Sequence, residues 1–414
     1  MTEASVPRPT SSRARWAVPA VVAVAVTGAF LAPPLLASAD ESVLPDVTPG
    51  QLVTTIAAAE PVPLSGTVVY TARLGLPEIP LAEMTGADPI ALLGGSSTLR
   101  VWTDGAERSR VALLGSASEY SVVQDGAEAW TYSSSDDAVV HYTLSAADQA
   151  RFDALADDAR AGTLPEVAGG LPTPDEAARA ALAQVEQYST VAMGDQTTVA
   201  GRDAYQLVVT PKDASTLIGK VVVAIDAETS TPLRVQTWSS TDSSSPALEI
   251  GFTDVAFTTP DDAVLAFSAP AGAAVKDVVV PLPEMTGAEP ETAPGTLPEG
   301  VSITGTGWET VTTWSGLDVA SLIAGDPAAL ATVPGAELTI GSESAQDLIE
   351  EFMPSDGSGS PSIPTLDTSV LYDQLTTAVP EGRLLSSTLL SVLVTDDGRV
   401  LVGAVPAETL RAMA

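Results

Sequence analysis

His141 is the only histidine of the chain, and the chain has no cysteine. A Ser–His–Asp hydrolase would have to use His141 as its base, yet no G-x-S-x-G segment supplies a nucleophilic serine. A zinc site needs several His or Cys ligands, and no Walker loop or dinucleotide-binding glycine motif follows an expected strand. We therefore expect a structural or surface role for His141, no metal, no cofactor and no enzyme activity.

Acidic side chains dominate the charge, with 53 Asp and Glu against 18 Lys and Arg and a net charge of -35. This excess excludes nucleic acid as a partner and disfavours electrostatic docking on anionic lipid headgroups. The first and last of four adjacent carboxylate pairs lie in expected turns, so they do not indicate a glycosidase, and the last lacks the spacing of a calcium loop. The pairs are Asp136-Asp137, Asp157-Asp158, Asp261-Asp262 and Asp396-Asp397.

Apolar and aromatic side chains on expected strands are the remaining candidates for a binding site. Trp102, Trp130 and Trp238 fall on such strands, where they can either pack in a core or line an apolar cavity. The sequence does not fix which strand face is concave, so we take the candidates for the lining together. They are Leu99, Val101, Trp102, Trp130, Tyr132, Leu207, Val209, Val223, Val235 and Trp238.

The N-terminus has the pattern of an export signal. Arg13 and Arg15 precede a long apolar run, and Ala37-Ser38-Ala39 fits a small-x-small cleavage site before Asp40. The alternative is a retained single-span membrane anchor, because the apolar run approaches spanning length. Pro33-Pro34 would break a helix near its outer end and so favours the cleaved signal. Both interpretations place the chain after residue 40 outside the cytoplasm, secreted or in the cell envelope.

Short hairpins dominate the expected elements. Asp104-Gly105 and Asp125-Gly126 each separate two strand-like runs, and Asp-Gly supplies the positive φ that a type I′ turn requires. Gly201 is expected in a short connection between antiparallel strands. Up to residue 268 we count ten or eleven expected strands.

Three helices are expected with these strands, one before them and two between them. Thr48-Pro49 is typical of the start of a helix that ends near Ala58. Ser145 with Asp148 indicates a second helix that ends near Gly162, and Thr173 begins a third.

Composition divides the chain into four segments. Residues 1–39 are the signal or anchor, and 40–270 hold the hairpins. Residues 271–300, rich in Pro, Gly and Glu, are expected to be a linker. Residues 301–414 form a C-terminal α+β extension with a flexible insert at 354–364 and a hairpin near the end.

A hairpin sheet of this size must twist and curl. The runs KVVVAI and QLVVT are apolar on both faces, so at least one face must be covered. We expect an α+β fold in which a strongly curved antiparallel sheet of about 11 strands forms a half-barrel around a few lid helices. Such a sheet either leaves an apolar cavity or is filled by those helices.

Five segments occur in an order that resembles the LolA-like superfamily of periplasmic lipoprotein carrier proteins, which includes RseB-like regulators. They cover about residues 48–270 and are LSGTVVYTARLGLP, LRVWTDGAERSRVAL, VAGRDAYQLVVTP, TPLRVQTW and FTDVAF. By this resemblance the half-barrel would hold acyl chains under a helical lid. The C-terminal segment GRLLSSTLLSVLVTDDGRVLVGAVP resembles the tail of exported relatives from high-GC Gram-positive bacteria.

The resemblance implies a monomeric, non-catalytic carrier of a lipid or an acylated lipoprotein. The alternative is an RseB-like regulator that binds a membrane or envelope protein such as an anti-sigma factor. Carriers of the family have an arginine in the cavity, and Arg73, Arg100 and Arg202 are the positions that could match it. The C-terminal extension makes the chain longer than the basic carrier of this superfamily.

Overall fold

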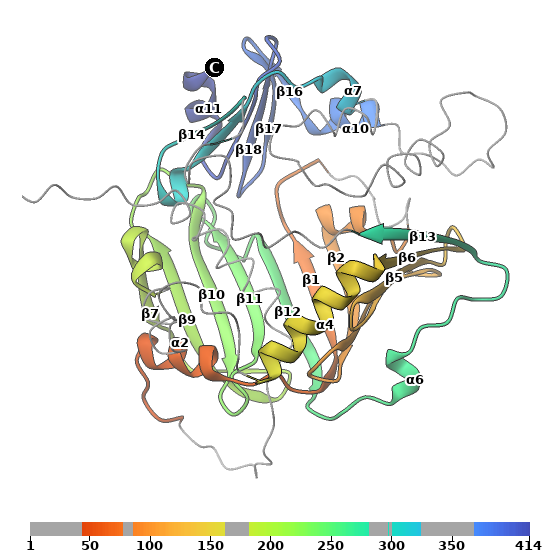
Figure 1. The fold of residues 1–414 in the computed structure, drawn as a ribbon. Coiled ribbons are helices and arrows are strands. Elements are labelled where there is room, and N and C mark those ends of the chain that lie inside the picture. The colour runs from red at the N-terminus through yellow and green to blue at the C-terminus, as the bar shows by residue number, and fades with distance from the viewer. Residues whose placement is uncertain (1–43, 78–85, 162–181, 281–296, 298–299, 324–367) are drawn as a thin grey trace, which may run out of the picture.

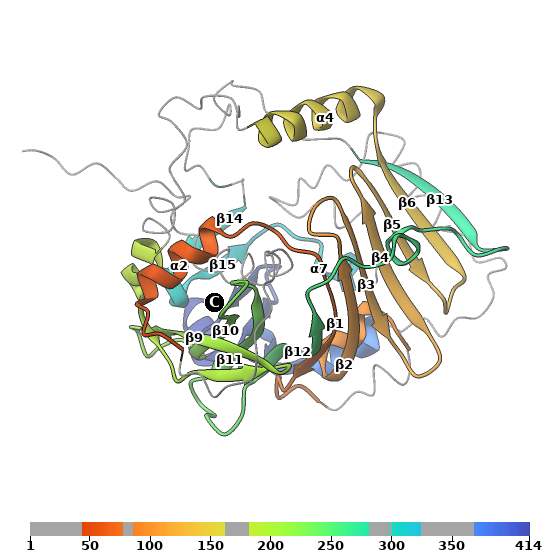
Figure 2. The ribbon, with the colours of Figure 1, turned by 90° about the horizontal axis from the view of Figure 1, so that it is seen from below.

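One large curved sheet organises the chain (Figure 1, Figure 2). The computed structural model describes residues 44–77, 86–161, 182–280, 297, 300–323 and 368–414. The expected signal or anchor, the start of the helix expected from Thr173 and the insert 354–364 lie outside these residues. Among the residues described, no helix is both long enough and apolar enough to cross a membrane.

Thirteen of the described strands belong to the large sheet, in the order β13-β6-β5-β4-β3-β2-β1-β12-β11-β10-β9-β7, with β8 pairing with β9. All neighbouring pairs are antiparallel except β13 with β6. This curved sheet confirms the expected fold class. The strands are β1 (Leu64–Ala72), β2 (Gly95–Thr103), β3 (Arg108–Leu114), β4 (Glu119–Asp125), β5 (Glu128–Ser133), β6 (Ala138–Leu144), β7 (Ser189–Met193), β8 (Thr197–Val199), β9 (Arg202–Pro211), β10 (Ile218–Asp226), β11 (Pro232–Ser239), β12 (Leu248–Ala256) and β13 (Ala274–Val280).

Hairpins form at both Asp-Gly pairs as expected, but neither is the expected type I′ turn, because only the glycine of each pair has a positive φ. Gly105 and Gly126 have positive φ between β2 and β3 and between β4 and β5. Between β8 and β9, Ala200 (φ 51°) and Gly201 (φ 76°) link Val199 to Arg202, which lie directly opposite each other. Two successive positive φ angles define a type I′ turn, so the connection expected at Gly201 is confirmed.

Two predicted helices are confirmed, and Figure 2 shows both on the concave side of the sheet. α2 (Pro49–Ala58) begins with a capping box of Thr48 and Gln51. α4 (Ala146–Ala161) begins where Ser145 Oγ accepts a hydrogen bond from the Asp148 amide at 3.2 Å. The remaining short helices are η2 (Pro89–Leu93), α6 (Asp262–Leu265), η3 (Gly307–Glu309), α7 (Val319–Ile323), α10 (Thr368–Leu375) and α11 (Ala407–Met413), and residues 182–188 are also helical.

The predicted linker 271–300 contains a strand instead. β13 runs parallel to β6 in unbroken register, with Ala274 opposite Ala138 and Val280 opposite Leu144. The Pro- and Gly-containing stretches on either side suggested a linker, but AVKDVVV itself is rich in β-branched residues.

The C-terminal extension forms a second sheet, in the order β14-β15-β19-β18-β17-β16. Residues 301–314 form two antiparallel strands, because Gly305 (φ 83°) and η3 interrupt them. The hairpin expected near the end of the chain is confirmed as β18 and β19, and β17 extends it. The strands are β14 (Val301–Thr304), β15 (Val311–Trp314), β16 (Thr377–Val379), β17 (Gly382–Ser386), β18 (Ser391–Thr395) and β19 (Val400–Gly403).

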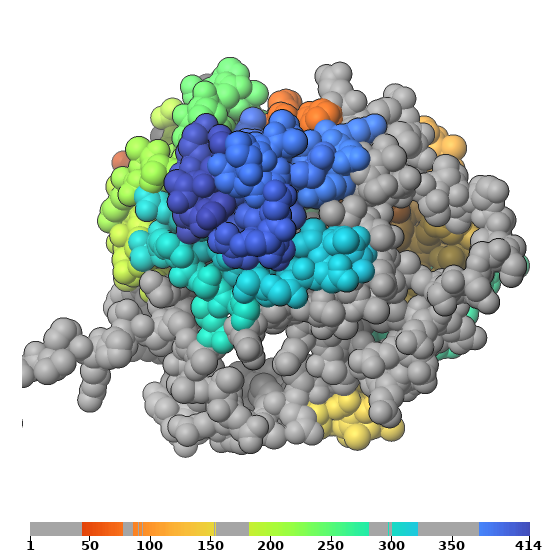
Figure 3. All heavy atoms as spheres, turned by 90° about the horizontal axis from the view of Figure 1, so that it is seen from above, coloured from red at the N-terminus to blue at the C-terminus, as the bar shows by residue number. Residues whose placement is uncertain are grey.

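The small sheet docks on the strand ends of the large one, as Figure 1 shows. The Leu217 amide donates to the Ala404 carbonyl at 2.7 Å, and the Thr388 amide donates to the Leu74 carbonyl at 2.8 Å. Trp308 Nε1 donates to Ser189 Oγ at 2.8 Å. Seen from above, residues 300–323 and 368–414 lie in front of the large sheet (Figure 3).

Candidate binding surfaces of the curved sheet

Each strand residue of the large sheet belongs to one of two faces, because residues opposite each other on neighbouring strands share a face. The inner face carries Val68, which lies opposite Leu99 in β2 and Phe252 in β12. The outer face carries Trp102 and its neighbours in register. The sheet curls toward the inner face, since β8 lies against β12 and Val199 packs in one cluster with Val68 and Phe252.

The six aliphatic candidates share the inner face. One row crosses β9, β10 and β11, where Leu207 lies opposite Val223 and Val223 opposite Val235. Leu99 and Val101 of β2 lie on the same face, because Leu99 is opposite Val68 of β1. The six residues are Leu99, Val101, Leu207, Val209, Val223 and Val235.

The chain itself covers the centre of the inner face. Val101 is 3% exposed and packs in the cluster with Val68 and Phe252. Val235 is 5% exposed and belongs to a second cluster, against which Trp308 and Leu389 of the C-terminal extension pack. Val101 and Val235 are therefore part of the protein's own core.

The inner face of β4 to β6 is more open. Val122 lies opposite Thr131, which lies opposite Val140, so the three form one row on this face. The side chains of Thr131 and Val140 are partly exposed, and Val122 is 41% exposed. This row offers accessible apolar surface on the inner face, and Leu99, Leu207, Val209 and Val223 are also partly exposed there.

The four aromatic candidates lie on the outer face, not with the aliphatic ones. Trp102 lies opposite Arg110, and Arg110 lies opposite Val123. Val123 in turn lies opposite Trp130, so Trp130 shares the face of Trp102. Tyr132 and Trp238 also point to this side. Successive strand residues point to opposite faces, so Val101 and Trp102 cannot line one surface. This alternation is the signal in the sequence that separates the two groups.

Basic side chains lie over two of the outer tryptophans. The Arg100 and Arg110 guanidinium carbons are 5.1 and 5.9 Å from the centroid of the Trp102 ring. Lys220 Nζ is 4.6 Å from that of Trp238. These contacts are cation–π interactions, so the rings pack against charged side chains rather than in an apolar cavity.

The short helix α6 covers the outer face of β2 to β4. Its Asp262 pairs with Arg108 at 2.8 Å, and its Leu265 is fully buried. Just beyond it, Phe267 stacks on Trp130 with ring centroids 5.7 Å apart.

His141 holds three strands together. Its ring stacks on Trp130 with a centroid distance of 4.9 Å and an angle of 3°. Nδ1 lies 2.9 Å from Asp277 Oδ1 on β13, and Nε2 lies 3.4 Å from Glu128 Oε2 on β5. Within the described ranges, no group of three or more His, Cys, Asp and Glu could hold a metal ion. Contacts to an aromatic ring and two carboxylates fit a structural histidine.

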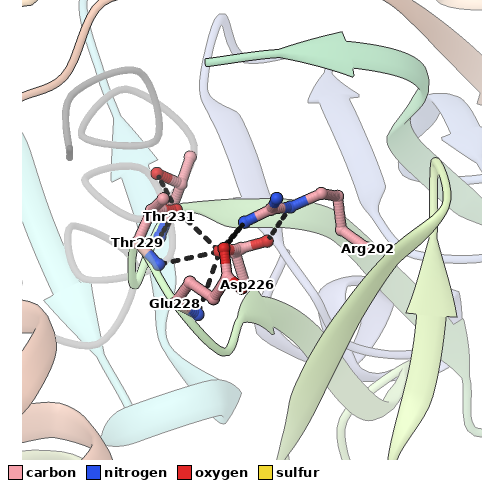
Figure 4. A network of polar contacts seen from close by, with 5 residues as sticks. All are labelled: Arg202, Asp226, Glu228, Thr229 and Thr231. Carbon is pink, nitrogen blue, oxygen red and sulfur yellow. Dashed lines mark hydrogen bonds and ion pairs between the residues drawn. The ribbon is translucent and has the colours of Figure 1, made fainter. Parts of the chain in front are cut away.

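Arg202 is the centre of a charged network at the turn between β10 and β11 (Figure 4). It donates to both oxygens of Asp226, from Nε at 2.7 Å and from Nη2 at 3.0 Å, and Nη2 also contacts Glu228 at 2.7 Å. The Thr229 amide and hydroxyl donate to Asp226 Oδ1 at 2.7 and 2.9 Å. The Arg202 side chain also lies over the Phe257 ring.

These contacts decide the charge states in the network. Burial raises the pKa of the Asp226 carboxyl, but the hydrogen bonds from Arg202 and Thr229 and the charge of Arg202 outweigh it, so the net pKa is lowered. Hydrogen bonding to Asp226 raises the pKa of the Arg202 guanidinium. Both groups are therefore charged at neutral pH and neutralise each other.

The three arginines that could match the cavity arginine of carriers have other contacts. Arg202 is paired in the network of Figure 4, and Arg100 lies over Trp102 on the outer face. Arg73 donates to the Pro246 carbonyl at 3.2 Å.

The central part of the chain is similar to a known protein family. Residues 94–258 match the family model of the MucB/RseB N-terminal domain. The match runs from β2 to β12 and so covers most of the curved sheet. No curated protein matches the chain.

Solved structures show limited similarity. The MucA/MucB complex of Pseudomonas aeruginosa includes a chain with 17% identity and a TM-score of 0.37, with 87% of this chain and 94% of that one covered. A LolA superfamily protein from Nitrosomonas europaea has 13% identity and a TM-score of 0.20, with 54% and 99% covered. At these scores the structures carry no argument about function, and they do not support the expected high-GC Gram-positive origin.

Proposed function

We propose that the chain is a non-catalytic regulator that binds a protein partner, such as an anti-sigma factor, outside the cytoplasm. The match of residues 94–258 to the MucB/RseB N-terminal domain carries this proposal. The similar Pseudomonas aeruginosa structure is a complex of MucB with MucA. The proposal assigns the chain to the cell envelope, in agreement with the signal-like N-terminus.

Two features of the fold favour a regulator over a simple carrier. The C-terminal sheet is bonded to the large sheet through Leu217, Thr388 and Trp308, so the two sheets can present one joint surface. In addition, Val101 and Val235 pack in the protein's own core, which reduces the surface left for an acyl chain.

A carrier of lipid or of an acylated lipoprotein is the second candidate. The row of Val122, Thr131 and Val140 on the inner face supports it, because this row offers partly exposed apolar surface on the concave side. An acyl chain binds such surface through the hydrophobic effect.

Binding to a defined partner tests the proposal. The purified chain is mixed with the extracytoplasmic segment of each anti-sigma factor of the same host, and affinity is measured by titration calorimetry. We expect one of these segments to bind in a 1:1 complex, while the extracytoplasmic segment of an unrelated sensor kinase does not. If none binds, and solvent extraction of the natively purified chain yields one lipid per chain, the carrier function is correct and the regulator function is wrong.

A further inference from the structure

β13 is the last strand at one edge of the large sheet. Among the described strands β6 is its only partner, so no described strand pairs with the backbone N–H and C=O groups of its second edge. It has seven residues, no proline and no break in register. Natural proteins usually blunt such an edge with proline, charged side chains, a bulge or a covering segment, because a free regular edge readily pairs with another strand. β13 has the charged residues Lys276 and Asp277, but neither proline nor a bulge.

The side chains of β13 also expose apolar surface. Val275 is 55% exposed and Val279 is 44% exposed, and both lie on the outer face. Between them on the same face lies Asp277, whose side chain is 75% exposed. On the outer face, the edge strand therefore presents one aspartate between two exposed valines.

The opposite edge of the sheet differs. β7 has five residues, and its first residue, Ser189, is buried beneath Trp308 of the C-terminal extension. Tyr188, just before β7, lies against Gly307. The covered start of β7 makes β13 the more accessible of the two edges.

The position of β13 is fixed before any partner binds. Asp277 contacts His141 at 2.9 Å, and Glu128 and Trp130 hold the other sides of the His141 ring. An added strand would therefore find an ordered template, which lowers the entropic cost of binding.

A second copy of the chain is a poor occupant of this edge. Residues opposite each other in an antiparallel pair share a face, so two copies pair residues of equal parity. A register centred on position 277 sets the two Asp277 side chains against each other. Two chains of net charge -35 also repel each other.

We propose that the free edge of β13 binds an extended segment of a protein partner as an added antiparallel strand. The segment has a Lys or Arg opposite Asp277 and β-branched apolar residues opposite Val275 and Val279. Backbone hydrogen bonds supply affinity, and the side chains supply register and selectivity. This inference deepens the proposed function and rests on it, because it names the edge at which the protein partner binds.

Two synthetic peptides test the edge on the full chain. One is Thr-Val-Thr-Lys-Thr-Val-Thr, and the other has Glu in place of Lys. We expect the Lys peptide to bind about fivefold more tightly, since an opposite-charge pair replaces a like-charge pair. Hydrogen exchange should slow at residues 274–280 when it binds. Equal affinity of the two peptides, or protection only elsewhere in the chain, would overturn the proposal.

A charge reversal sharpens the test. Asp277→Lys should reverse the preference, so that the Glu peptide binds more tightly. The matched control is Asp254→Lys, which reverses an exposed carboxylate on the same face of the central strand β12 and should leave the preference unchanged. An unchanged preference in Asp277→Lys contradicts the proposal, provided that residues 274–280 of the free variant exchange as slowly as in the wild type.

A second variant tests the edge even if Asp277→Lys weakens the pairing of β13 with β6. The double substitution Val275→Ser and Val279→Ser keeps the Asp277–His141 contact, and we expect it to weaken the Lys peptide about fivefold. Unchanged affinity would overturn the assignment of these valines.

The two proposals can fail separately. If an anti-sigma segment binds wild type and the double variant equally well, the proposed function holds and the β13 edge is wrong. If no such segment binds but the Lys peptide protects residues 274–280, the edge holds and the proposed partner is wrong.

Discussion

Asp226 shows how one buried side chain can fix a whole turn. Its side chain is 1% exposed, and an unpaired carboxylate in that position would be strongly unfavourable. Arg202 arrives from the adjacent strand β9, while Glu228 and Thr229 donate backbone N–H groups from the turn itself. The carboxylate thus links the β8–β9 turn to the β10–β11 turn at one end of the sheet.

Removing this charge should destabilise the fold. We expect Asp226→Asn to lower the free energy of unfolding by about 3 kcal/mol, because the guanidinium of Arg202 loses its bidentate partner. The control is Glu228→Gln, at a more exposed carboxylate of the same network, with an expected loss of under about 1 kcal/mol. Urea denaturation at pH 7 measures both values, and equal losses would refute the special role of Asp226.

The pH dependence of stability follows from the same carboxylate. The pKa of Asp226 is lowered in the fold, so the unfolded chain binds its proton more tightly. The stabilisation is fully present above the unfolded pKa of about 3.9 and is lost as pH falls through the lower folded pKa. The difference in unfolding free energy between wild type and Asp226→Asn should therefore stay constant from about pH 7 to 5 and shrink below about pH 4. Urea titrations at a series of pH values measure this difference. A difference that grows toward acid pH contradicts the argument.

At the scale of elements, local signals were predictable from the sequence. The hairpins at the Asp-Gly pairs, the short connection at Gly201 and the helix start at Thr48 depend on residues within a few positions of each other. The type I′ geometry expected at the Asp-Gly pairs is wrong, because neither aspartate has a positive φ. Strand faces were predictable as well, since alternation already separates Val101 from Trp102. The choice of the inner face was not, because it depends on how β8 curls over β12.

β13 marks the limit of such prediction. Its partner β6 is distant in the sequence, and the contact between His141 and Asp277 spans 136 positions. Parallel pairing needs a long connection, so no turn signal announces it. For the same reason the role of His141 as a tie between three strands could not be derived from the sequence, although its non-catalytic character could be expected.

At the scale of the molecule, the two sheets share a hydrophobic interface. Trp308 and Leu389 of the extension pack against a cluster of Ile218, Val221 and Val235 on the large sheet. Hydrogen bonds surround this cluster, among them Ser239 Oγ to the Thr388 carbonyl at 2.9 Å. The packing and the bonds together make the extension part of the folded core rather than a tethered appendage.

Trp308 is the side chain that tests this interface. Trp308→Ala removes the bond to Ser189 and the packing on the cluster, and we expect it to lower the free energy of unfolding by about 2 kcal/mol. Small-angle X-ray scattering should show a larger radius of gyration, because the small sheet separates from the large one. The control is Trp314→Ala, at a tryptophan that pairs with Val301 and Val400 within the small sheet. It should lower stability without changing the radius of gyration of the native chain. An unchanged radius in Trp308→Ala, despite lost stability, would mean that the remaining backbone bonds hold the two sheets together without the tryptophan.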